Sequence, residues 1–185
     1  MRLGLLSDTH LPEAGRDLPP EVYDALRGCD AILHGGDITI GRLLDSLEEI
    51  APVYAAMGNH DEHLFADPRV EPVHWLSFEG HTVALLHRFE PLEWDLERLC
   101  ARFFEGERPD VVVFGDSHFE SIEQREDVLL INVGSATLPR NLSPRLGHVG
   151  YLTLEAGRPP VAELVDLSAG ANDGFMRTGA EQRGE

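Results

Sequence analysis

The stretch Gly58-Asn59-His60-Asp61 decides how the chain is interpreted, because it follows directly on the apolar run at residues 53–57. Two upstream stretches have the same form: Asp8-Thr9-His10 follows apolar residues 3–6, and Gly36-Asp37 comes after apolar residues 31–33. A short apolar run that ends in glycine or a polar residue predicts a buried strand. Such a strand delivers the side chains that follow it to one edge of a sheet.

Two further stretches downstream repeat the pattern. His87 follows apolar residues 83–86, and Gly115-Asp116-Ser117-His118 follows apolar residues 111–114. All five strand ends therefore carry Asp, Asn or His, which are ligand types for divalent metals. Their recurrence predicts that five strand ends converge on one metal-rich site.

The composition is that of one globular domain. The chain has 185 residues, of which 42% are hydrophobic and 26% charged. The apolar runs fall short of the ~20 residues that cross a bilayer, and the amino terminus begins on a strand, so we expect a cytoplasmic protein without a membrane partner. The net charge of −18 disfavours binding to polymeric nucleic acid.

The order of predicted elements indicates an α/β fold. Strands at residues 2–7, 30–33 and 53–57 alternate with helices at 20–27 and 40–50, which is typical of a parallel sheet. A hairpin at 73–78 and 81–86, a helix from about residue 92 to 104 and a strand at 111–114 follow. Further strands are expected at residues 119–124, 128–133, 148–155 and 161–167. The pattern predicts two sheets packed face to face with helices outside.

We expect a single domain over residues 1–167. The remaining residues, 168–185, are rich in Gly, Ala and polar side chains, and their low apolar content predicts a disordered tail.

Each motif taken alone has an ordinary structural alternative. Asp8 and His10 are two positions apart, so an extended backbone would point both side chains the same way, but an Asp that caps a turn is the more common interpretation of this triplet alone. Gly36-Asp37 is also a frequent turn sequence. His87 and His118, considered singly, suit packing or exposed positions. The occurrence of all of them at successive strand ends favours a metal site.

In this order, the motifs resemble those of the calcineurin-like metallophosphoesterases. The later stretches Asn132-Val133-Gly134-Ser135 and Leu138-Pro139-Arg140 are similar to the small YfcE-type phosphodiesterases of bacteria and archaea. The resemblance extends from residue 1 to about residue 167. It implies a four-layer αββα sandwich of two mixed β-sheets flanked by helices, with a dinuclear metal centre.

The resemblance also implies a division of the ligands between two divalent ions, most commonly Mn²⁺, with Fe, Ni, Zn or Mg as alternatives. It assigns Asp8, His10 and His118 to one ion, and Asn59, His87 and Asp116 to the other. Asp37 would bridge them. Ions held ~3.5–4 Å apart share a hydroxide that attacks phosphorus in line. His60 would act at the leaving oxygen, with Asp61 either orienting its ring or capping a turn.

The chain departs from the family pattern at two positions. Asp116 stands where the family has the first histidine of Gly-His-x-His, and it could bind a metal directly, through a water, or not at all. Arg88 follows His87 where a small residue is usual. Arg88 and Arg140 are candidates for contact with a substrate phosphate, and a solvated arginine is the alternative for each.

Three functions are compatible with these motifs. The expected one is hydrolysis of a small phosphoester, a diester before a monoester. The alternative from another class is a protein-interaction scaffold of the same fold, in which the catalytic histidine is replaced; the histidine at position 60 favours the enzyme. A nuclease acting on polymers is disfavoured by the acidic charge. The sequence leaves the oligomeric state open, a homo-oligomer included.

Overall fold

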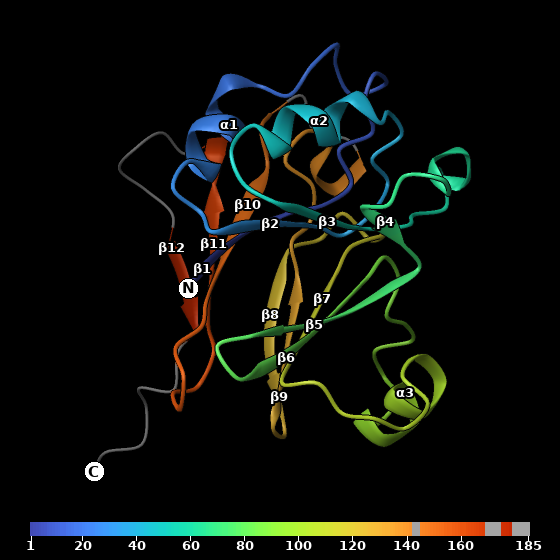
Figure 1. Cartoon of the computed structure of the whole chain (residues 1–185), viewed down its shortest axis with the longest axis vertical. Helices are drawn as coiled ribbons and strands as arrows, with labels where there is room; N and C mark the ends of the chain where they lie inside the picture. The colour runs from blue at the N-terminus through green and yellow to red at the C-terminus, as the bar shows by residue number, and fades with distance from the viewer. Residues whose placement is uncertain (142–144, 169–174, 179–185) are drawn as a thin grey trace.

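The fold consists of two mixed β-sheets packed face to face, with helices on the outer faces. It is described here by a computed structural model that covers residues 1–141, 145–168 and 175–178, the last range by its backbone. Figure 1 shows the layers in order: α1 and α2, one sheet, the second sheet, and α3. The α/β sandwich expected from the sequence is confirmed.

The larger sheet has seven strands in the order β12-β11-β10-β1-β2-β3-β4. From β1 to β4 neighbouring strands are parallel, whereas β10, β11 and β12 are added in antiparallel fashion. The strands are Arg2–Leu6 (β1), Ala31–His34 (β2), Val53–Ala56 (β3), Val70–Glu71 (β4), His148–Thr153 (β10), Val161–Asp166 (β11) and Phe175–Thr178 (β12).

The smaller sheet has five strands in the order β5-β6-β7-β9-β8. Its centre, β6-β7-β9, is parallel, and β5 and β8 pair with it in antiparallel fashion. The strands are Val73–Phe78 (β5), His81–Leu86 (β6), Val111–Phe114 (β7), Ser121–Arg125 (β8) and Val128–Asn132 (β9).

In the part of the chain that the structure describes, three α-helices cover the sheets, namely Pro20–Leu26 (α1), Arg42–Glu48 (α2) and Leu96–Phe103 (α3). Short 3-10 turns lie at Glu62–Leu64 and Pro139–Asn141. The predicted helix near residue 92 begins only at Leu96. The carboxylate of Asp95 accepts a hydrogen bond of 2.7 Å from the Arg98 backbone amide and so caps the helix at that point.

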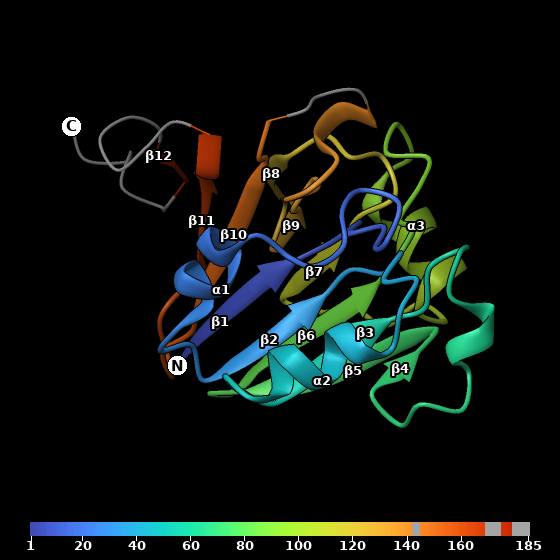
Figure 2. The ribbon, with the colours of Figure 1, turned by 90° about the horizontal axis from the view of Figure 1, so that it is seen from above.

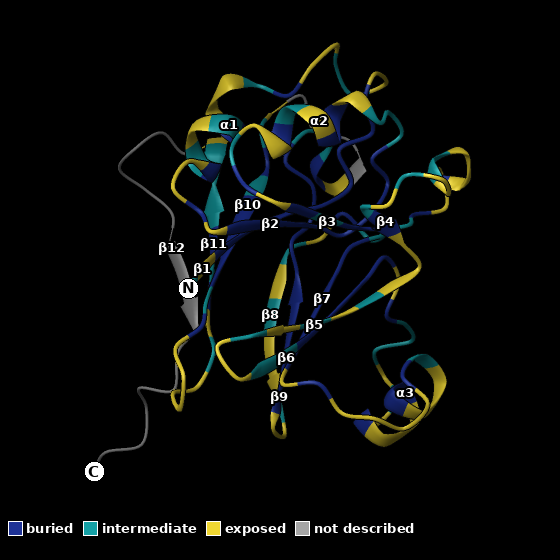
Figure 3. Ribbon diagram, in the orientation of Figure 1, coloured by how far each residue is buried: buried dark blue, intermediate teal, exposed yellow. Residues whose placement is uncertain are grey.

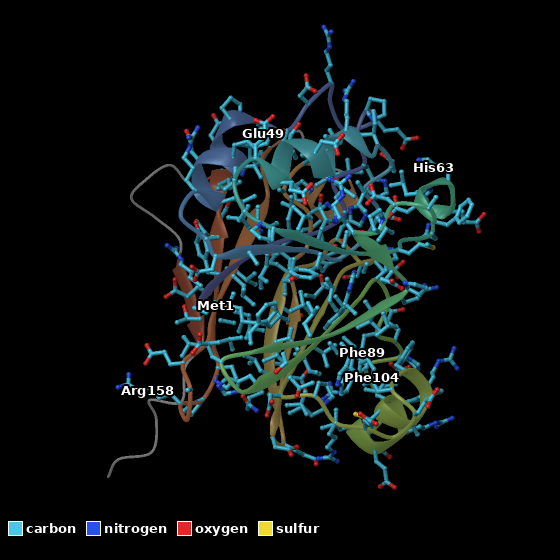
Figure 4. All side chains as sticks on the ribbon, viewed as in Figure 1. Met1, Glu49, His63, Phe89, Phe104 and Arg158 are labelled. Atoms are coloured by element: carbon cyan, nitrogen blue, oxygen red, sulfur yellow. The ribbon has the colours of Figure 1, made fainter. Side chains whose placement is uncertain are left out.

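Alternation along the strands separates the core into layers. Leu3 and Leu5 of β1 face the space between the sheets, whereas Leu6 packs under α1 and α2. On the far side, α3 covers the smaller sheet, where Phe89 and Phe104 stack with ring centroids 5.5 Å apart (Figure 4). Figure 3 shows the central strands buried and the outward sides of the helices exposed. A close-packed interior of this kind holds the strand ends in fixed positions.

The predicted disorder of residues 168–185 falls mostly on residues 169–174 and 179–185, which lie outside the described residues. One part of the predicted tail differs from the expectation: the backbone of Phe175–Thr178 forms β12 and pairs with β11. Within the described ranges, the helices are too short and too polar for any of them to span a membrane.

Candidate metal centre

All five predicted strand ends meet at one edge of the sandwich. Figure 2 shows the arrowheads of β1, β2 and β6 pointing the same way, although the strands belong to different sheets. The carboxyl ends of parallel strands share one edge of a sheet, and packing the sheets face to face brings the two edges together. The side chains after β1, β2, β3, β6 and β7 therefore lie beside one another.

The first cluster contains Asp8, His10 and His118. Nε2 of His10 lies 3.2 Å from Nε2 of His118, which is itself 3.6 Å from Oδ1 of Asp8. Potential ligand atoms from all three residues lie within 4.8 Å of one another, and all three residues are buried. This is the set that the family resemblance assigns to one ion.

The second cluster forms around His87. Its Nε2 lies 3.0 Å from Oδ1 of Asn59, 3.5 Å from Oδ1 of Asp116 and 3.6 Å from Oδ1 of Asp37. Asp37 also reaches the first cluster, because its other oxygen, Oδ2, lies 3.3 Å from Nε2 of His10. One carboxylate thus faces both clusters, with a different oxygen toward each.

Two of the imidazoles are held in the orientation that a metal ligand needs. Nδ1 of His87 contacts the backbone carbonyl of Gly35 at 2.8 Å, and Nδ1 of His118 contacts that of Leu138 at 2.8 Å. Because a carbonyl only accepts hydrogen bonds, both Nδ1 atoms are donors. In the neutral rings, each Nε2 then carries a free lone pair directed into the cluster.

The electrostatics of the site also suit a cation. Burial raises the pKa of the Asp8 carboxyl to about 7, and the nearby Asp37 carboxylate adds to the effect, although His87 and the Ser7 hydroxyl oppose it. The Ser7 hydroxyl donates a 2.6 Å hydrogen bond to Asp8 Oδ2. A buried carboxylate in this position is costly unless a positive charge accompanies it. Carboxylate, amide and imidazole donors together fit a divalent metal ion.

The backbone at the site adopts conformations that are rare elsewhere. Five candidate ligands have positive φ angles, namely Asp8, His10, Asp37, Asp116 and His118, with φ between 45° and 69°. Such left-handed conformations are sparsely populated for residues other than glycine, and they cluster at functional sites. Gly115 contributes through its lack of a side chain, since a Cβ there would collide with Ser7 and Asp8.

The exposed ring of His60 lies at the solvent side of Asp37. Its Nε2 is 4.0 Å from Asp37 Oδ2, and its ring centroid is 5.3 Å from that of His10. The ring is therefore on the Oδ2 side of Asp37, while the backbone amide of His60 donates a 3.1 Å hydrogen bond to Oδ1.

Asp61 does not point at that ring in the way that an orienting carboxylate would. It is fully buried, and its two oxygens accept hydrogen bonds from three backbone amides: Oδ2 from Ile38 at 3.1 Å and Gly58 at 2.9 Å, and Oδ1 from Thr39 at 2.8 Å. The side chain also makes no capping hydrogen bond at the 3-10 turn Glu62–Leu64 that follows, so its observed role differs from both alternatives open from the sequence. Asp61 ties the loop after β2 to the loop after β3.

The two candidate substrate arginines differ in position. Arg88 reaches the second cluster, where its Nε lies 3.0 Å from Oδ2 of Asp116 and 3.4 Å from Glu90. Arg140 donates to Glu120 through Nη2 at 2.8 Å. Its backbone amide binds the carbonyl of His118, but its charge is directed to Glu120 instead of the clusters.

Several supporting residues were not among the predicted site residues. Ser135 donates from its hydroxyl to the Asp8 carbonyl at 2.6 Å, and Asn132 donates to the carbonyl of Gly115 at 2.9 Å. His34 accepts from the Gly36 amide at Nδ1, so Nε2 carries the proton toward the Thr9 hydroxyl. Burial lowers the pKa of His34 to about 4, which keeps it neutral. The signals for these residues were the stretch Asn132-Val133-Gly134-Ser135, which contributes to the family resemblance, and the place of His34 just before Gly36-Asp37.

Comparison with known proteins agrees with this geometry. Residues 1–157 match the calcineurin-like phosphoesterase superfamily domain. A protein of Methanothermobacter thermautotrophicus named as a probable metallophosphoesterase is 36% identical over 146 residues, which cover 78% of this chain and 82% of that protein.

Two solved structures are similar in fold. Vacuolar protein sorting 29 from Cryptosporidium parvum superimposes with a TM-score of 0.77 at 20% identity, covering 96% of this chain and 97% of that one. A structure described as a novel archaeal phosphodiesterase gives a TM-score of 0.65 at 19% identity. The superposition covers 90% of this chain and 100% of the archaeal one. At these identities the likeness concerns the fold alone.

Proposed function

The chain belongs to the calcineurin-like phosphoesterase superfamily, and we propose that it is a metal-dependent phosphodiesterase with two divalent ions in its centre. The observation that carries the proposal is the position of Asp37. Its Oδ2 faces His10 and its Oδ1 faces His87, so one carboxylate can serve an ion on either side. The expected metal is Mn²⁺.

The ligand assignment follows from the two clusters. Asp8, His10, His118 and Asp37 would hold the first ion, and Asp37, Asn59, His87 and Asp116 the second. When bound, such an ion pair generates a nucleophile from water at neutral pH and withdraws charge from the phosphoryl oxygens. The mixed oxygen and nitrogen donors of each set are compatible with Mn²⁺, Zn²⁺ or Fe.

His60 has the position for the proton transfer. In hydrolysis, a water oxygen bonds to phosphorus and the bond from phosphorus to the leaving alcohol breaks. The oxygen of the leaving alcohol then takes up a proton. The His60 ring is exposed and lies on one side of Asp37, within reach of a substrate that bridges the clusters. It would donate the proton to the leaving oxygen, or stabilise its charge. The hydrogen bonds that Asp61 accepts from the amides of Gly58 and Ile38 would hold the loop that carries His60 close to Asp37.

A diester is favoured over a monoester by charge. The protein has a net charge of −18, and Asp116 adds a carboxylate where the family has a neutral histidine. A phosphodiester carries one negative charge and a monoester carries up to two, so the diester meets less repulsion. The cytoplasmic location and the absence of nucleic-acid partners stay predictions from the sequence.

The experiment that tests the proposal combines metal analysis with an activity screen. Purified protein is treated with chelator, reloaded separately with Mn²⁺, Zn²⁺, Ni²⁺, Fe²⁺ or Mg²⁺, and assayed on bis-p-nitrophenyl phosphate and p-nitrophenyl phosphate. We expect chelator-sensitive hydrolysis, greatest with Mn²⁺ and with the diester. Failure to hydrolyse either ester with any of the metals would overturn the proposal and favour the scaffold alternative.

A further inference from the structure

A cleft of about 710 Å³ opens on one side of the candidate metal centre. Asn59, His87 and Asp116, which form the second cluster, line it at one end. The cleft also extends over apolar side chains, and none of these belongs to the metal clusters. Those side chains have no assigned role in hydrolysis, so the cleft calls for a separate explanation.

The apolar lining comes from parts of the chain that are distant in sequence. Met57 follows β3, Val73 begins β5, Leu86 ends β6 and Phe103 ends α3. Val73 and Leu86 are paired across the β5–β6 hairpin. Val73 is 37% exposed, which is high for a valine in a sheet. A concave apolar lining beside convergent polar groups is typical of a ligand site.

The position of the cleft relative to His60 determines which part of a substrate it can hold. The ring of His60 lies on the Oδ2 side of Asp37, near His10, whereas the cleft lies on the Oδ1 side, around His87. In-line displacement reserves the side opposite the leaving oxygen for the attacking water, so the retained ester group lies beside the phosphorus. The cleft next to the second cluster has room for such a group.

The charges around the cleft restrict that alcohol further. The cleft lining includes Arg88 as its basic side chain, and Arg88 already lies beside the carboxylates of Asp116 and Glu90. Glu62 adds another negative charge to the lining. A second phosphate or a carboxylate on the substrate would find no unpaired cation among the residues that line the cleft, so charged alcohols are disfavoured.

We propose that this cleft binds the retained alcohol of the phosphodiester, and that this alcohol is uncharged and apolar, such as an aryl group. The inference rests on the proposed phosphodiesterase function and specifies its substrate class. It assigns the apolar residues of the cleft to substrate specificity, and it separates them from the metal ligands.

The test uses substrates that share one leaving group. Methyl, phenyl and 4-carboxyphenyl esters of p-nitrophenyl phosphate all release p-nitrophenolate, so their differences in kcat/KM, normalised to the uncatalysed rates, report on the retained alcohol. For the Mn²⁺-loaded full chain we expect the phenyl ester to exceed both the methyl and the carboxyphenyl esters by ~10-fold or more.

Two variants and a matched control locate the effect. Phe103→Ala and Val73→Ser should each lower the ratio of kcat/KM for the phenyl ester to kcat/KM for the methyl ester by ~5–10-fold. The value for the methyl ester alone should change by less than ~2-fold. Val161→Ser is the control, because Val161 is 36% exposed, like Val73, but lies on β11 in the other sheet. Val73→Ser keeps the test valid if Phe103→Ala fails to fold, since Phe103 also packs against Phe89.

Binding is measured separately from turnover, so that the two proposals can fail independently. Calorimetric titration with diphenyl phosphate and dimethyl phosphate should show tighter binding of the diphenyl ester, and Val73→Ser should abolish the difference. Selective binding of diphenyl phosphate without hydrolysis of any ester would overturn the proposed phosphodiesterase function but support the cleft as a site for an apolar group. Equal kcat/KM values for the methyl and phenyl esters, or equal losses on both esters in the variants, would overturn the proposal that the cleft binds the retained alcohol.

Discussion

Nε of Arg88 lies 3.0 Å from Oδ2 of Asp116, while the other oxygen of the same carboxylate lies 3.5 Å from Nε2 of His87. Asp116 therefore stands between an arginine and a candidate metal ligand. The two positions at which the chain departs from its family pattern are in contact with each other. A carboxylate shared in this way has less charge to offer a metal than one that faces only the ion.

Asp116 should make the second metal site weak and selective for hard ions. We expect Asp116→Ala to lower the affinity for the second ion by ~10–100-fold. Asp116→His restores an imidazole, so it should tighten that site and shift its preference from Mn²⁺ toward Zn²⁺. Calorimetric titration of the metal-free protein measures both effects. Glu90→Gln is the control, because it removes the other carboxylate near Arg88 at 3.4 Å without touching the cluster. Unchanged affinities in Asp116→Ala would show that Asp116 is no ligand.

His60 should matter most for alcohols that leave with difficulty. We expect His60→Ala to reduce kcat by ~10²–10⁴-fold for a diester with an alkyl leaving group, because proton donation is then needed. The loss should be smaller for p-nitrophenolate, which departs without a proton. His63→Ala is the control on the adjacent turn (Figure 4). Nε2 of His63 contacts the carbonyl of Thr39 at 3.0 Å. Equal losses on both substrates would exclude the acid role and leave electrostatic stabilisation.

Asp61 should contribute to folding even in the absence of metal. Asp61→Ala leaves the amides of Ile38, Thr39 and Gly58 without their acceptor, and each buried amide left unpaired costs ~1–3 kcal/mol. Urea unfolding of the chelator-treated protein measures the loss. Asp17→Ala, which removes an exposed ion pair with Arg42, should change the free energy of unfolding by less than ~1 kcal/mol. If Asp61→Ala were as stable as Asp17→Ala, the hydrogen bonds of Asp61 would not be what holds the loop after β2 to the loop after β3.

The network around Arg69 should make stability depend on pH in the acid range. Arg69 contacts Asp67, Asp45 and Glu48, and its hydrogen bond to Asp67 holds the pKa of that carboxyl below its usual 3.8. The stabilisation by ionised Asp67 is therefore complete above pH 3.8 and is lost as the pH falls through the lowered folded-state pKa.

Urea unfolding of the wild type and of Asp67→Asn between pH 2.5 and pH 6 tests this dependence. We expect the wild type to be the more stable at pH 6 and the difference to shrink below pH 3.8. Asp24→Asn is the control and should change the free energy of unfolding at pH 6 by less than ~1 kcal/mol, because Asp24 and Arg27 form an exposed pair. A difference between wild type and Asp67→Asn that stayed constant over the whole pH range would contradict the account.

The strand ends could be predicted because their signal is local. An apolar run followed by Asp, Asn or His sets both the strand and the edge at which its ligand lies, as at Asp8 and His87. β4 escaped prediction because Val70–Glu71 is too short for a periodic pattern. β12 escaped because the composition around Phe175–Thr178 resembles that of a disordered segment, while its pairing partner β11 supplies the hydrogen bonds.

Contacts between distant residues could not be predicted in the same way. Asp61 accepts from amides 22 and 23 positions earlier in the chain, and the sequence left its role open between an orienting carboxylate and a cap. The cleft joins Phe103 of α3 to Val73 of β5, and each looks like an ordinary packing residue within its own element. Only the packing of elements brings such residues into one site.

The most direct test of two ions in one hydrolytic centre is a titration that records stoichiometry and activity together. Chelator-treated protein receives Mn²⁺ in steps, bound metal is measured by calorimetry, and hydrolysis of bis-p-nitrophenyl phosphate is measured at each step. We predict two sites of unequal affinity, with hydrolysis rising as the second site fills. Asp37→Ala removes a ligand from both sites, so it should weaken both and abolish activity. Full activity with one bound ion, or two bound ions without hydrolysis, would contradict the account.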